Sequence, residues 1–127
     1  MKLLLDTNRY TDFCKGLHDS VSVVTSAEHV YLPFVVLAEL RAGFRAGTQG
    51  KRNEEVLSRF LLSPRVSVLY PDEATTQTYA GLFVQLRRQG TPIPTNDIWI
   101  AALAVQHGLA LHSRDAHFDA LPQLLRA

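Results

Sequence analysis

Four acidic residues, far apart in the chain, stand where strands or helices are expected to begin or end. They are Asp6, Glu39, Asp97 and Asp115. If the fold gathers them, their carboxylates repel one another, and at least one takes up a proton unless a cation is bound. Mg²⁺ and Mn²⁺ prefer oxygen ligands of this kind. Because such a cation can activate a water and neutralise phosphoryl charge, the four acids predict phosphodiester hydrolysis.

Short apolar runs alternate along the chain with segments of helical spacing. The expected strands cover residues 2–5, 30–34, 66–69 and 109–111. The expected helices cover residues 7–17, 36–46, 54–62, 72–88 and a last one that Thr95 or Asn96 caps and that runs to His107. This alternation predicts one domain over residues 1–127, an α/β sandwich around a mainly parallel sheet.

In a parallel sheet, sites form at the edge where the strands end. Asp6 and Asp115 each follow a strand, Asp97 starts a helix, and Glu39 can point back from the first turns of its helix. Apolar neighbours flank all four acids, which predicts a partly enclosed cleft. Each acid also has a structural interpretation, because Asp97 and Asp115 could cap helices and Glu39 could be exposed. Asp6 is harder to explain without a partner, because it directly follows a buried strand.

The composition limits the classes of function. The apolar fraction of 46% can fill a core without a disulfide, and Cys14 has no second cysteine to pair with. No apolar run approaches the length of a membrane span, so we expect a soluble, cytoplasmic protein that contacts no membrane. The net charge of +1 excludes a globally basic nucleic-acid binder.

One segment is nevertheless basic. Residues 41–65 contain six basic and two acidic residues, a net charge of +4. Arg41 and Arg45 in this segment could contact an RNA backbone, and a solvated helix face explains them equally well.

Other residues have simpler interpretations. The histidines His107, His112 and His117 match no zinc-ligand spacing, so we expect local hydrogen-bonding or surface roles. Tyr79 and Phe83 fit either the core or a dimer face, and the pattern does not separate the two.

This chain lacks the motifs of other enzymes that act on or bind phosphate groups. A dehalogenase-like phosphatase needs a second Asp where Asn8 stands, and a receiver domain needs a Lys at the end of a late strand, which this chain does not have. A dinucleotide-binding domain needs a Gly-x-Gly-x-x-Gly turn, which is also missing.

Four segments, in this order, together resemble the PIN-domain family, specifically its VapC-type toxins. They are Leu4-Leu5-Asp6-Thr7-Asn8, Leu37-Ala38-Glu39-Leu40-Arg41-Ala42-Gly43, Asn96-Asp97-Ile98-Trp99-Ile100-Ala101-Ala102 and Ser113-Arg114-Asp115-Ala116-His117-Phe118. The resemblance covers nearly the whole chain. It implies a three-layer α/β/α sandwich, an Mg²⁺- or Mn²⁺-dependent endoribonuclease, a homodimer, and inhibition by a cognate antitoxin.

The same resemblance assigns roles to single residues. It implies that Asp6, Glu39, Asp97 and Asp115 form the catalytic, metal-binding quartet, and that Thr7, Asn8 and Ser113 orient the acids or a bound water. Asp6 and Asp97 are also expected to be direct metal ligands from their places at a strand end and a helix start. The assignment of Glu39 and Asp115 depends more on the resemblance. Arg9 departs from the aliphatic residue expected after Asn8. The alternative function is a non-catalytic PIN-like module that binds RNA or a protein.

Overall fold

The computed structural model describes residues 1–127 and alternates strands with helices. The strands are β1 (Lys2–Leu5), β2 (His29–Pro33), β3 (Val66–Leu69), β4 (Ala110–His112) and β5 (Leu125–Arg126). The helices are α1 (Thr7–Cys14), α2 (His18–Ser26), α3 (Phe34–Ala46), α4 (Gly50–Leu62), α5 (Glu73–Gln89), α6 (Thr95–His107) and the short 3₁₀ helix η1 (Ala116–Ala120).

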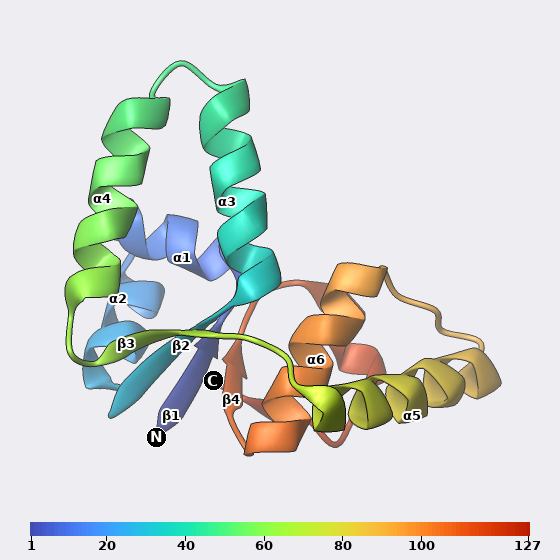
Figure 1. Cartoon of the computed structure of the whole chain (residues 1–127). Coiled ribbons are helices and arrows are strands. Elements are labelled where there is room, and N and C mark those ends of the chain that lie inside the picture. The colour runs from blue at the N-terminus through green and yellow to red at the C-terminus, as the bar shows by residue number, and fades with distance from the viewer.

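The five strands form one sheet in the order β3-β2-β1-β4-β5, and every pair is parallel. The central strand β1 is fully buried from Leu3 to Leu5, which explains its continuous run of leucines. Helices α1 and α2 lie on one side of the sheet and α5 and α6 on the other, while α3 and α4 stand as a pair that extends beyond it (Figure 1). The predicted three-layer α/β/α fold is confirmed.

Helix α6 places its first turn at the carboxyl edge of the sheet. Its middle, from Ile100 to Leu103, has no exposed surface, as its apolar sequence predicts. It ends at Gly108, whose φ of 63° is the left-handed conformation that glycine adopts readily. The predicted cap at Thr95 or Asn96 is wrong. Pro94 occupies the N-cap position and no side chain caps the helix, so α6 begins with unpaired backbone N–H groups.

Several boundaries differ from the prediction. Helix α1 ends at Cys14 because Gly16 turns the chain with a φ of 74°, so Leu17 lies outside the helix and is 50% exposed. Elements α2, η1 and β5 were not predicted, and α4 begins one turn earlier than predicted, at Gly50. No helix in the structure combines the length and the apolar character that crossing a membrane requires.

Candidate active site

Asp6 is fixed at the end of β1 by hydrogen bonds on both carboxylate oxygens. Its Oδ1 accepts from the backbone N–H of Thr7 at 2.8 Å, and its Oδ2 accepts from Ser113 Oγ at 2.6 Å and from Asn8 Nδ2 at 3.4 Å. Its own N–H donates to the backbone oxygen of His112 at 3.1 Å. With only 5% of its surface exposed, Asp6 is a buried acid whose orientation is largely determined by its neighbours.

Ser113 links the loop after β4 to the start of α1. Its hydroxyl oxygen accepts from the backbone N–H of Asp115 at 3.1 Å and from Asn8 Nδ2 at 3.3 Å. Asn8 Oδ1 in turn accepts from the backbone N–H of Arg114 at 3.2 Å. The three polar residues expected to orient the acids therefore all contact them, because Thr7 also donates its hydroxyl to the carboxylate of Glu39 at 3.2 Å.

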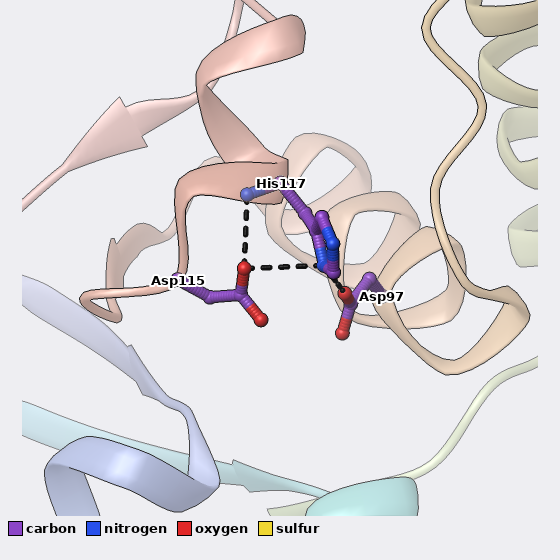
Figure 2. Close-up of side chains that lie close together, drawn as sticks. All are labelled: Asp97, Asp115 and His117. Carbon is purple, nitrogen blue, oxygen red and sulfur yellow. Dashed lines mark hydrogen bonds and ion pairs between the residues drawn. The ribbon is translucent and has the colours of Figure 1, made fainter.

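Asp97 and Asp115 approach each other around the imidazole of His117 (Figure 2). His117 Nδ1 lies 2.8 Å from Asp97 Oδ2 and 3.1 Å from Asp115 Oδ1. Asp115 Oδ1 also accepts from the backbone N–H of His117 at 2.9 Å, which makes Asp115 the cap of η1. The side chains of Asp97, Asp115 and His117 are 14%, 32% and 49% exposed, so this part of the site opens to solvent.

Crowding of the carboxylates changes how they bind protons. Burial, together with the charges of Asp6 and Asp97, raises the pKa of Glu39, although a hydrogen bond from Thr7 opposes the shift. Burial also raises the pKa of Asp97, with the charges of Asp115 and Asp6 adding to it and the His117 hydrogen bond opposing it. The hydrogen bond to Asp97 and the two nearby carboxylates raise the pKa of His117. All four acids therefore belong to one negatively charged site.

The donor set fits a hard divalent cation. Asp97 Oδ1 and Asp115 Oδ2 have no hydrogen-bond partner in the protein, and burial, with a smaller contribution from neighbouring carboxylates, raises the pKa values of Glu39 and Asp97. Oxygen ligands of this kind suit Mg²⁺ or Mn²⁺. Asp97 also lies in the first turn of α6, where the unpaired N–H groups favour negative charge.

Two further predictions concern the surroundings of the acids, namely a partly enclosed cleft and contacts of Arg41 and Arg45 with RNA. The predicted partly enclosed cleft is not confirmed, because none of the four surface cavities is lined by any of the acids. Arg41 donates its Nε to Glu54 at 3.0 Å and so faces α4, while Arg45 is exposed near the end of α3.

The position of His117 was not predicted. This histidine was expected to have a surface or local hydrogen-bonding role, and it does form hydrogen bonds, but with two of the four acids. The available signal was its place two residues after Asp115. The buried acid Asp12, whose partner Arg114 lies in the loop after β4, was not predicted either.

A parallel sheet between helical layers, with carboxylates gathered at its carboxyl edge, defines the architectural class of this protein. Comparison with known families identifies the family within that class. The model of the PIN domain family matches residues 3–124, and the chain therefore belongs to the PIN-domain family.

Its similar proteins include named ribonucleases. The chain is 37% identical over 90 residues to Ribonuclease VapC4 of Mycobacterium tuberculosis, covering 71% of this chain and 69% of that protein. It is 34% identical over 119 residues to Ribonuclease VapC1 of Haemophilus influenzae strain R2866, covering 89% and 83%. The VapC-type resemblance noted in the sequence is confirmed.

Solved structures agree with this assignment. The structure of VapBC-1 from nontypeable Haemophilus influenzae has a TM-score of 0.86 at 26% identity and covers 100% of this chain and 97% of that one. The FitAcB structure from Neisseria gonorrhoeae has a TM-score of 0.81 at 30% identity and covers 98% and 96%. Both likenesses extend over almost the whole length of both chains.

Proposed function

We propose that this chain is an Mg²⁺- or Mn²⁺-dependent endoribonuclease and the toxin of a toxin–antitoxin pair. The observation that carries the proposal is the gathering of Asp6, Glu39, Asp97 and Asp115 at one edge of the sheet, where burial and the charges of neighbouring acids raise the pKa values of Glu39 and Asp97. The ribonuclease names of its relatives supply the class of substrate.

The residues of this chain have separate tasks in the proposed reaction. Ser113, Asn8 and the N–H of Thr7 hold Asp6 in one orientation, so its carboxylate is ready for a cation without rearrangement. Asp97 and Asp115 each present a carboxylate oxygen without a hydrogen-bond partner, and the charge of Asp6 acts on Asp97. A bound Mg²⁺ or Mn²⁺ would lower the pKa of a water and neutralise charge on the phosphodiester. Glu39 and Asp97, whose pKa values are both raised, would take up a proton more readily than an ordinary carboxylate.

The proposed partners follow from the same relatives. The solved neighbours include a VapBC protein and FitAcB, each of which covers nearly all of this chain. We propose that this chain likewise binds a cognate antitoxin and forms a homodimer. Arg41 and Arg45 remain proposed contacts for the RNA backbone, and Arg45 is the better placed of the two because Arg41 is paired with Glu54.

Cleavage of RNA by variants of single acids tests the assignment. We expect Asp6→Asn and Asp97→Asn each to lower Mg²⁺-dependent cleavage by at least about 100-fold, roughly 2.7 kcal/mol in the barrier. Asn at position 6 keeps the shape of the side chain and the ability to cap α1, so the fold should persist. Chelation with EDTA should abolish cleavage by the wild type, and added Mg²⁺ or Mn²⁺ should restore it.

Glu28→Gln is the matched control, because Glu28 is an exposed acid at the opposite edge of the sheet, where it pairs with the N-terminus. This variant should cut RNA at the wild-type rate. Wild-type rates in Asp6→Asn or Asp97→Asn would overturn the assigned site. A wild type that binds RNA but never cuts it, with Mg²⁺ or Mn²⁺ present, would instead support the non-catalytic binding module.

A further inference from the structure

His117 joins two acids that come from different parts of the chain. Its Nδ1 lies 2.8 Å from an oxygen of Asp97, in α6, and 3.1 Å from an oxygen of Asp115, in the loop after β4. Its backbone N–H also donates to that oxygen of Asp115. The residue therefore holds Asp115 twice and reaches across to Asp97 with its ring.

These contacts use only one oxygen of each carboxylate. Asp97 Oδ1 and Asp115 Oδ2 remain without a hydrogen-bond partner. Figure 2 shows both of these oxygens on the side of the carboxylates away from the imidazole ring. The charge of Asp6 acts on Asp97 from that same cluster. The ring therefore sits behind the two acids, relative to the space that their free oxygens share.

We propose that His117 is a positioning residue that clamps Asp97 and Asp115 so that their free oxygens face one divalent cation. The inference rests on the proposed function, because it concerns the cation of that same site. Hydrogen-bonding partners behind the ligands of a metal fix the orientation of those ligands and thereby raise the affinity for the ion. The clamp does this for two ligands at once.

The geometry favours a clamp over a ligand. His117 Nδ1 is hydrogen-bonded to Asp97 Oδ2 and forms an ion-pair contact with Asp115 Oδ1, so its one N–H is already used by a carboxylate. Mg²⁺ prefers oxygen to nitrogen ligands, and free carboxylate oxygens are available next to the ring. The clamp thus predicts that no imidazole nitrogen enters the coordination sphere of the ion.

Binding of Mn²⁺, followed by electron paramagnetic resonance, tests the clamp without any need for cleavage. We expect His117→Ala to weaken Mn²⁺ binding by about 10–100-fold, the usual cost of losing a group behind a metal ligand. His117→Asn should bind close to the wild type, because the amide nitrogen of Asn stands where Nδ1 stands and can still donate. Spin-echo spectra of bound Mn²⁺ should show no coupling to a histidine nitrogen in the wild type.

His107→Ala is the matched control, since His107 is an exposed histidine at the other end of α6. It should leave Mn²⁺ affinity unchanged. Strong nitrogen coupling would overturn the clamp and make His117 a ligand. Equal affinities for His117→Ala and the wild type, or an equal loss in His117→Ala and His117→Asn, would also overturn it.

The outcomes separate this inference from the proposed function. A wild type that binds Mn²⁺ through the clamp but cuts no RNA contradicts the ribonuclease alone. A wild type that cuts RNA, with His117→Ala binding Mn²⁺ equally well, contradicts the clamp alone. A wild type that binds neither Mn²⁺ nor Mg²⁺ contradicts both.

Discussion

At the scale of single residues, acids that could bind a cation also lower the stability of the metal-free protein. An acid with a raised pKa in the folded state holds its proton more tightly there than in the unfolded chain. The free energy of unfolding of the metal-free protein therefore falls as pH rises from the unfolded pKa through the folded one. Glu39 and Asp97 both shift in this direction, so each lowers the stability of the metal-free protein at neutral pH.

This effect predicts the behaviour of Glu39→Gln. Without a cation at neutral pH, the variant should be more stable than the wild type, because it lacks a charge that partial burial and the neighbouring acids disfavour. The residue as a whole is exposed, so solvent screens the effect to about 0.3–0.5 kcal/mol, or roughly 1–3 °C in Tm. The gain should vanish below about pH 4.5, where the carboxyl is protonated in both states. Thermal unfolding in EDTA across this pH range measures it.

Millimolar Mg²⁺ should reverse the order of the two proteins. A cation that binds only the folded state stabilises it, and Glu39→Gln loses part of that stabilisation. A Gln variant whose Tm rises with Mg²⁺ as much as that of the wild type would remove Glu39 from the site.

The residues also differ in how far the sequence could predict them. Asp6 was predictable because a buried strand ends there, and a carboxylate at such a point needs partners. The role of His117 was not, because it depends on η1 turning the ring towards Asp97, 20 residues earlier in the chain. Glu39 was placed by resemblance, and no local pattern indicates that Thr7 donates to it from the neighbouring helix.

At the scale of elements, an ion pair between a buried acid and an exposed arginine fastens the loop after β4 to α1. Asp12, in α1, has a side chain only 5% exposed, and it accepts from Arg114 Nε at 3.0 Å and Nη2 at 3.2 Å. Arg9 adds a longer contact at 3.4 Å. Arg114 lies between Ser113 and Asp115, so this pair holds the loop that carries these two residues of the site.

The pair predicts a specific acid sensitivity. Hydrogen bonds from Arg114 hold the pKa of Asp12 below its ordinary value. A lowered pKa contributes stability at pH values above the unfolded pKa, and that stability is lost as pH falls through the folded pKa, below about pH 4. Asp12→Asn should therefore cost about 1 kcal/mol at neutral pH, because solvent screens the exposed Arg114, or about 3–6 °C in Tm, and much less in acid.

Asp119→Asn is the control for this variant, because Asp119 is an exposed acid that also pairs with an arginine, Arg126. Thermal unfolding should show a change within about 0.5 kcal/mol for the control. A loss for Asp12→Asn that stays the same at acid and neutral pH would show that the charge of Asp12 contributes nothing.

The elements themselves were mostly predictable where the apolar pattern is long. Helices α3, α5 and α6 follow from periodic apolar residues and from Gly90 and Gly108, which take left-handed C-cap conformations. Helix α2 was not predictable, because its sequence HDSVSVVTS is rich in β-branched and small polar residues that have low helix propensity. Its serine Ser20 is buried and donates to the backbone oxygen of Arg9, a tertiary contact that the sequence does not reveal.

At the scale of the whole molecule, the fold explains how distant segments form one site. Parallel pairing of β1 with both β2 and β4 brings the ends of these strands to one edge. The connection between α5 and α6 brings the chain back to that edge. Helix α6 begins there, and its first turn contains Asp97. The four acids therefore meet because of the order of the strands, which the alternation of elements predicts as a class but does not specify strand by strand.

The proposed toxin role makes its last prediction at this scale, in living cells. Induced expression of the wild-type chain should arrest growth, and Asp6→Asn should not, because the intact fold without a working site cuts no RNA. Co-expression of a short reading frame that precedes the gene and encodes a DNA-binding N-terminus should restore growth, and its product should copurify with the chain. Growth arrest by Asp6→Asn as strong as that by the wild type would show that the chain acts by binding, not by cleavage. Mapping of RNA ends after induction would then identify the RNA that the wild type cuts, since Asp6→Asn supplies the matched background.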